Sequence, residues 1–178
     1  MNRSVTALLV TLSALVLSGC YQSAQSLIAT GAGDFPFPQR ARYTSFEWNA
    51  AMNAWDESEP GLAVRDGDHY VQTPDGSTPN DATPFMLKSI GGGYYIGQEE
   101  SDSHYVYDLL KIEGDTVYEY GLTCDDAARA FQSQGLIDGI ESAGVLGNTC
   151  TVSNFDKLAQ VFRAQVNRQP KAKFVIAR

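Results

Sequence analysis

Two short turn motifs, each between a pair of β-prone runs, limit the fold of this chain more than any other feature. Asp66-Gly67-Asp68 joins residues 62–65 to 69–72, and Glu113-Gly114-Asp115 joins residues 104–112 to 116–122. An acidic residue followed by glycine between two such runs is a strong signal for a β-hairpin. We therefore expect antiparallel strands from both regions.

The register of the second hairpin depends on which residues form its turn. A two-residue turn at Glu113-Gly114 would place Asp108 opposite Glu119. Two like charges that face each other across a strand pair are destabilising. A turn shifted by one or two residues avoids this pairing, and the sequence therefore weakly favours the shifted register.

Other segments predict further strands and loops. Strands are expected at residues 85–90 and 94–98, joined through Gly91-Gly92-Gly93, with an acidic turn at 99–103. Residues 73–83 are rich in Pro, Gly, Asn and Asp, which is typical of a loop. Residues 135–147 are predicted as loop with at most a short helix, and 149–152 and 173–177 as short strands.

Helical patterns appear at three places. Asp125-Asp126 indicates the start of a helix that runs to about residue 133, because acidic side chains suit a helix N-terminus. Ser153 or Asn154 is expected to cap a helix through about residue 167, which carries one apolar stripe. Apolar residues in 43–55 follow helical spacing, with a strand at 42–48 as the alternative. The sum predicts an α+β domain over residues 42–178: an antiparallel β-meander with two or three packed helices.

The first 19 residues have the organisation of an export signal. A short start with one positive charge, Arg3, precedes an apolar run at 5–17, which is too short to span a membrane as a helix. We expect residues 1–19 to be removed as a signal peptide.

The end of this segment, Leu17-Ser18-Gly19-Cys20, resembles the lipobox of bacterial membrane lipoprotein precursors. The resemblance implies cleavage before Cys20, diacylglycerol on its sulfur and usually a third acyl chain, such as palmitate, on the new amino group. Two or more chains give stable anchoring, whereas one chain holds only marginally. Tyr21 follows in place of the Asp that resembles an inner-membrane retention signal. The resemblance thus implies a cell-envelope lipoprotein and, if the host has two membranes, favours the outer membrane, with the domain facing the periplasm.

Between lipid and domain, residues 20–41 are predicted as a lipidated, flexible tether. The stretch at 22–33, QSAQSLIATGAG, is small and polar, as is typical of linkers.

The two remaining cysteines, Cys124 and Cys150, form an even pair in an oxidising compartment, which predicts one disulfide. Closing a loop of this length is worth roughly 3–4 kcal/mol in the chain-entropy model. No Cys-x-x-Cys redox motif is present, and the two histidines lie far from both cysteines in sequence.

The chain is acidic, with a formal net charge of −8. Such a surface opposes nucleic-acid binding, which depends on Lys and Arg at phosphates. The partners that remain are the membrane, through the lipid anchor, and an envelope protein or glycan.

Tyrosines on the predicted strands form the candidate binding surface, since a tyrosine offers a flat apolar ring with a polar tip. The alternative is cross-strand packing, which tyrosine does well. The tyrosines considered are Tyr94, Tyr95, Tyr105, Tyr107, Tyr118 and Tyr120.

No residue set predicts catalysis, a metal or a cofactor. Gly91-Gly92-Gly93 lacks the Lys and Ser/Thr of a phosphate loop, and His69 and His104 lie near no Gly-x-Ser-x-Gly motif. The acids at 66–68 and 99–102 do not form a twelve-residue calcium loop. The sequence therefore favours a non-catalytic binding or scaffolding module, with a hydrolase or hydrolase inhibitor acting on cell-wall or surface polymer as the alternative.

Overall fold

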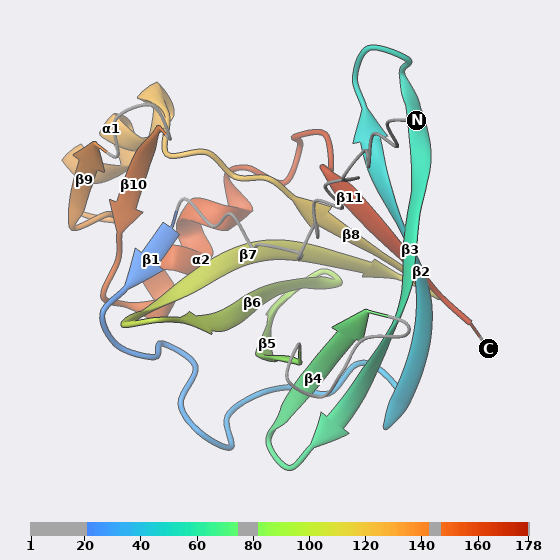
Figure 1. The fold of residues 1–178 in the computed structure, drawn as a ribbon. Helices are drawn as coiled ribbons and strands as arrows, with labels where there is room; N and C mark the ends of the chain where they lie inside the picture. Colours follow the sequence, from blue (N-terminus) through green and yellow to red (C-terminus); the bar gives the residue numbers. More distant parts are fainter. Residues whose placement is uncertain (1–20, 75–81, 143–146, 178) are drawn as a thin grey trace, which may run out of the picture.

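A computed structural model describes residues 21–74, 82–142 and 147–177. The export signal and Cys20 lie outside the described residues. Within them, eight antiparallel strands form a closed barrel (Figure 1). The barrel strands are β2 (Arg40–Asn49), β3 (Ala54–Asp66), β4 (His69–Pro74), β5 (Thr83–Gly91), β6 (Tyr94–Ser101), β7 (His104–Glu113), β8 (Thr116–Tyr120) and β11 (Ala172–Ile176).

The barrel follows a simple path. Strands β2 to β7 each pair with the next strand in the sequence, and β11 lies between β8 and β2 to complete the ring. Three shorter strands extend the wall beside β7: β1 (Tyr21–Ser23), β10 (Asn148–Thr151) and β9 (Gly139–Ser142). β1 pairs antiparallel with the first half of β7 and parallel with β10.

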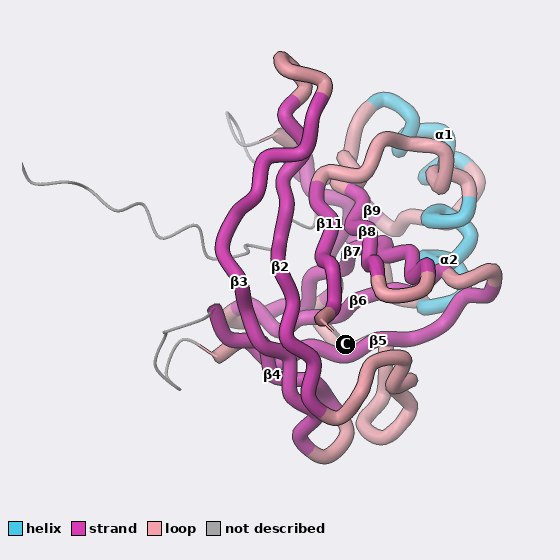
Figure 2. Tube along the Cα trace, turned by 90° about the vertical axis from the view of Figure 1, so that its right-hand side faces the viewer, coloured by secondary structure: helices cyan, strands magenta, loops and turns pink. Residues whose placement is uncertain are grey.

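The two helices are short and lie on one side of the barrel, away from β2 and β3 (Figure 2). Asp125 caps α1 (Asp126–Ser133), and Asn154 caps α2 (Phe155–Arg163), as the sequence predicted. α2 ends before residue 167. Among the described residues, neither helix has the length and apolar character needed to cross a membrane.

The predicted α+β class is therefore wrong, because the protein is mostly β and its main element is a closed barrel. The helical pattern at 43–55 misled the prediction. In β2, Ala41, Tyr43 and Ser45 are buried and alternate with more exposed residues, which is the period of a strand. Ala50 and Ala51, which completed the helical spacing, lie in the turn between β2 and β3.

Both predicted hairpins are present. Asp66 pairs with His69, and Glu113 pairs with Thr116, so each motif forms a two-residue turn. The second turn is thus shifted by one residue, and Glu119 pairs with Leu110 instead of Asp108, which confirms the favoured register. The acidic turn predicted at 99–103 is shorter than expected: β6 continues to Ser101, which pairs with His104, and only residues 102–103 form the turn. The loop predicted at 135–147 contains β9.

The segment predicted as a flexible tether differs most from expectation. Tyr21 is 1% exposed, and its ring lies 5.2 Å from that of Phe162 in edge-to-face geometry. Ile28 is also buried, and the backbone N–H groups of Leu27 and Ile28 donate hydrogen bonds to Gln98 Oε1 at 2.9 and 2.8 Å. Residues 21–28 are therefore part of the folded domain.

Two apolar regions stabilise the fold. One lies between the outer wall of β6–β8 and the helices and includes Tyr107, Leu109, Leu158 and Phe162, all at most 1% exposed. The other is the barrel interior, which in an eight-stranded barrel is just wide enough for side chains to fill. Gly61 pairs with Tyr43, and a Cβ at Gly61 would overlap the Tyr43 ring. The absence of a side chain at Gly61 thus makes room for Tyr43 inside the barrel.

Candidate functional site

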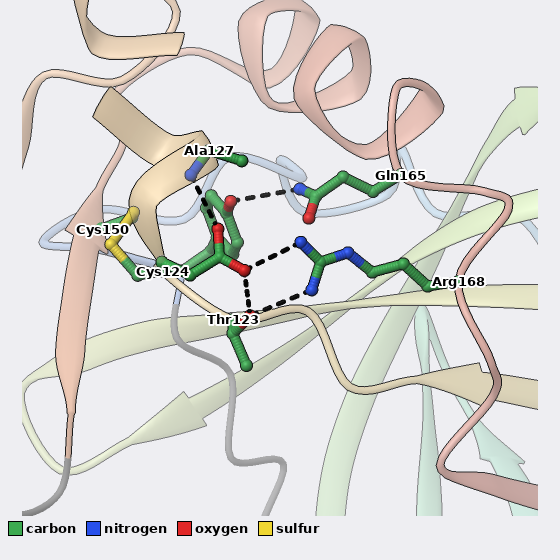
Figure 3. Close-up of a disulfide and its surroundings, with 8 residues drawn as sticks. Thr123, Cys124, Ala127, Cys150, Gln165 and Arg168 are labelled. Atoms are coloured by element: carbon green, nitrogen blue, oxygen red, sulfur yellow. Dashed lines mark hydrogen bonds and ion pairs between the residues drawn. A yellow bond between two sulfur atoms is a disulfide. The ribbon is translucent and has the colours of Figure 1, made fainter. Parts of the chain in front are cut away.

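The disulfide predicted from the cysteine pair is present. Cys124, just before α1, bonds to Cys150 of β10 with a Cα–Cα distance of 5.5 Å (Figure 3). Cys150 pairs with Tyr21 in the parallel β1–β10 ladder. The covalent bond therefore fixes the strand against which the first described residue packs.

Hydrogen bonds next to the disulfide connect it to the segment that follows α2. Asp125 accepts hydrogen bonds from Thr123, Arg168 and the Ala127 N–H at 2.8, 2.9 and 3.0 Å. Burial alone would raise the pKa of Asp125, but these hydrogen bonds outweigh it and lower the pKa below its usual value. Close by, Gln165 Nε2 donates to the hydroxyl of Tyr21 at 3.1 Å (Figure 3).

The six candidate tyrosines do not form one exposed face. Tyr107 and Tyr120 are 1% and 5% exposed and belong to the core beneath the helices. Tyr94, Tyr105 and Tyr118 are partly buried against that same core, whereas Tyr95 pairs with Leu110 on the opposite face of β6. Burial raises the pKa of Tyr107 to about 12. The structure therefore places most of these rings in packing roles.

The histidines are also separated. His69 begins β4 and its Nδ1 lies 3.2 Å from Asp68 Oδ1, while His104 begins β7. The described residues include no group of three or more His, Cys, Asp or Glu side chains placed to hold a metal ion.

The sequence did not predict the most unusual chemical feature, which is a group of acids inside the barrel. Glu99 of β6, Asp108 of β7 and Glu119 of β8 lie close enough to influence one another's charge, and we call them the carboxyl cluster. The side chains of Asp108 and Glu119 are 2% and 5% exposed. Lys171, which precedes β11 and is 30% exposed, lies with its Nζ 2.6 Å from Glu119 Oε1 and 3.5 Å from Asp108 Oδ1.

The backbone opposite Asp108 makes room for this lysine. One position beyond the last paired residues of β7 and β8, the register places Gly121 opposite Asp108. A Cβ on Gly121 would lie 3.0 Å from Lys171 Cδ, which is tighter than nine in ten real Cβ contacts. The glycine therefore lets the Lys171 side chain pass close to the strand and reach both carboxylates.

The single positive charge of Lys171 does not balance the negative charge that the three acids of the carboxyl cluster would carry when ionised. Among the described residues, neither Asp108 Oδ2 nor Glu99 Oε2, both buried, has a hydrogen-bond partner. Burial, followed by the charge of Glu119, raises the pKa of Asp108 to about 7, and the same two causes raise the pKa of Glu99 to about 7. The pKa of Lys171 is raised by Asp108 and Glu119 in spite of its burial.

Two more acids continue from the carboxyl cluster toward solvent. Glu119 pairs with Ala172, Ala172 with Glu47, and Glu47 with Asp56, so these side chains share one face of four neighbouring strands. Glu47 and Asp56 are exposed, whereas Glu119 is buried. We call Glu119, Glu47 and Asp56 the acidic row. The row thus runs from two exposed carboxyl groups on β3 and β2 to a buried one on β8.

Two pockets lie elsewhere. One, of about 390 Å³, lies beside the β3–β4 turn and is lined by Phe35, Phe37, Gln39, Arg65 and Gly67. The Arg65 side chain in this pocket already has partners. Its guanidinium lies 3.5 Å from the Phe35 ring centre, and its Nε donates a hydrogen bond to Gly67 O. The other, of about 570 Å³, lies between residues 23–27 and 151–155.

Comparisons of this chain with protein-family models, with curated proteins and with solved structures find no match.

Proposed function

We propose that this protein is a lipid-anchored envelope lipoprotein that acts as a non-catalytic binding module, with lipid on Cys20 and the barrel facing the periplasm from the outer membrane. One observation carries the proposal: Tyr21, the residue after the lipobox cysteine, is locked into the fold. Its ring packs on Phe162, its hydroxyl accepts a hydrogen bond from Gln165, and its backbone pairs with β7 and β10.

Adjacent Cα atoms are only 3.8 Å apart. A lipid on Cys20 would therefore hold the barrel directly at the bilayer surface. A rigid link of this kind suits a module that holds a partner at a fixed position, because little orientational freedom is then lost on binding.

The anchor is tested by fractionation and mass measurement. The natural chain is expected in the membrane fraction, with Cys20 as its first residue and the added mass of two or three acyl chains. Cys20→Ser is expected to leave the protein unprocessed and without lipid, while Cys124 and Cys150 still form their disulfide. A natural chain that is found in the membrane fraction without added lipid mass on Cys20 would contradict the anchor.

The binding function is tested by cross-linking the anchored protein in cells and identifying the adduct by mass spectrometry. One dominant protein or glycan adduct is expected. In a second variant, Tyr21→Ala loosens the first strand but leaves Cys20 in place, and it should give fewer adducts because the barrel is no longer held at a fixed position. Adducts that are no more frequent than those of an unrelated lipoprotein at equal abundance would count against a binding module.

A further inference from the structure

The carboxyl cluster holds more negative charge than its visible partners can balance. Asp108 and Glu119 share the ammonium group of Lys171, and Glu99 adds a third carboxyl nearby. Two buried oxygens, Asp108 Oδ2 and Glu99 Oε2, have no hydrogen-bond partner among the described residues. Burying an uncompensated charge is strongly unfavourable, so a positive group or a proton must offset it. Asp108, at 2% exposure, is the strongest single indication, because its Oδ2 is unpartnered and lies inside the cluster.

The acidic row provides an electrostatic path to this position. Exposed Glu47 and Asp56 lie on the same face as buried Glu119, on strands that are neighbours in the barrel. Carboxylates in a row at one end of a low-dielectric interior concentrate cations there. Asn49 donates a hydrogen bond to Asp56 Oδ2 at 2.8 Å, which fixes that carboxylate at the outer end of the row.

The chemistry of the cluster favours an organic cation over a metal ion. The described residues offer no set of three ligands with metal-binding geometry. A primary ammonium group instead carries three N–H donors, and hydrogen bonds from a charged donor to a carboxylate are among the strongest in proteins.

We propose that the carboxyl cluster binds the ammonium head of an aliphatic amine that enters the barrel along the acidic row. The amine bridges Asp108 Oδ2 and Glu99 Oε2, while Lys171 keeps its contacts with Asp108 and Glu119. This inference rests on the proposed binding function and names the chemical class of its ligand. Two sources supply this group, a free diamine and the lysine side chain of an envelope protein.

The test is calorimetric titration of the full chain, purified in detergent, at pH 7. The probes are 1,5-diaminopentane for the free amine, acetyl-Gly-Lys-Gly-amide for the lysine side chain, and 1,5-pentanediol as a neutral control of similar length. We expect at least one amine to bind and the diol not to bind. Repeating the titration in two buffers of different ionisation enthalpy should show proton release, because the bound cation holds Glu99 and Asp108, whose pKa values are raised, more fully ionised. The other charged groups that face this position are Glu119 and Lys171, with Glu47 and Asp56 farther along the acidic row.

Two variants locate the binding position. Asp108→Asn and Glu99→Gln are each expected to weaken amine binding about tenfold or more, the loss typical of a charge-assisted hydrogen bond. Glu100→Gln is the matched control, since Glu100 is exposed and adjacent to Glu99, on the other face of β6. It should change affinity less than about twofold. Circular dichroism checks that each variant folds. If Asp108→Asn does not fold, the affinity of Glu99→Gln alone decides whether the amine binds at the carboxyl cluster.

The proposal is overturned if neither amine binds, if the diol binds as well as the amines, or if both site variants bind like Glu100→Gln. A failed titration, with lipid on Cys20 and a cross-linked partner still found, would remove the amine ligand and leave the binding function in place. If amine binding, lipid on Cys20 and the cross-linked partner were all absent, both the amine ligand and the proposed binding function would be ruled out.

Discussion

The side-chain amide of Gln165 donates a hydrogen bond to the hydroxyl of Tyr21 at 3.1 Å, across 144 positions of sequence. Gln165 lies just after α2 and Tyr21 lies in β1, so this contact joins the first strand to the segment that follows α2. Both side chains are buried. The residue next to the predicted lipid attachment is therefore held by the same core that supports α2.

Tyr21→Ala should lower the free energy of unfolding by about 3–5 kcal/mol, the range for deleting a buried aromatic side chain. Tyr21→Phe should cost only about 1 kcal/mol, because it removes the hydrogen bond and keeps the ring. Urea unfolding measures both. Met52→Ala, at a 64% exposed residue, is the control and should change stability by less than about 0.5 kcal/mol. Equal stability of Tyr21→Ala and the control would mean that β1 is not part of the fold.

Reducing the disulfide should destabilise the protein by roughly 3–4 kcal/mol, since the Cys124–Cys150 bond closes a sequence separation of 26 residues. Unfolding with and without a reductant measures this difference. The double variant Cys124→Ala/Cys150→Ala should show the low stability under both conditions. A wild-type transition unaffected by the reductant, with free thiols confirmed by alkylation, would contradict the expected contribution.

Stability should depend on pH through the carboxyl cluster. Glu99 and Asp108 have pKa values of about 7 in the folded protein, above their ordinary values of 4.5 and 3.8. Between about pH 4 and pH 7 the folded state binds more protons than the unfolded state, so the free energy of unfolding falls as pH rises through this window. Asp125, whose pKa is lowered, acts in the opposite direction but only below about pH 4.

Denaturant unfolding from pH 4 to pH 8 tests this dependence. Asp108→Asn should show a smaller fall, because it removes one of the two groups that take up a proton on folding. Glu100→Gln should keep the natural slope. Stability that rises from pH 5 to pH 7 in the natural chain and in both variants would show that the cluster is not buried as described.

Gly61→Ala should destabilise the barrel by about 1–3 kcal/mol, because the added methyl group would overlap the Tyr43 ring inside it. Gly33→Ala is the matched control. A Cβ there meets its nearest atoms at 3.5 Å, which is ordinary contact. Thermal unfolding compares the melting temperatures of the two variants, which carry the same substitution in a crowded position and in one with ordinary contacts. Equal melting temperatures would mean that Tyr43 does not fill the space opposite Gly61.

The local features of the fold followed from the sequence where a short motif determined them. The two hairpin turns, the shifted register at Glu113, both helix caps and the disulfide were all predicted. Each depends on a few neighbouring residues, such as glycine in a turn or Asp125 at a helix N-terminus. β2 was harder to predict, because Ala50 and Ala51 in its turn matched the spacing of a helix.

Barrel closure and the carboxyl cluster depend on contacts between distant segments, which no local pattern contains. Closure needs β11 between β8 and β2, about 50 residues after β8. Asp108 did leave a signal, because it interrupts the inward-facing positions Val106, Leu110 and Ile112 of a strand. An acid among such apolar positions indicates a buried charge, but its partner Lys171 could be found only from the structure.

The height of the barrel above a bilayer tests the central claim most directly. Neutron reflectometry of the lipidated protein in a supported bilayer measures the water layer between lipid headgroups and protein. We predict that protein density begins at the headgroups, because one peptide unit separates Cys20 from the fixed residue Tyr21. A freely flexible segment over residues 20–41 would instead average roughly 25 Å from end to end. A water layer of about that thickness would contradict a barrel held rigidly at the membrane.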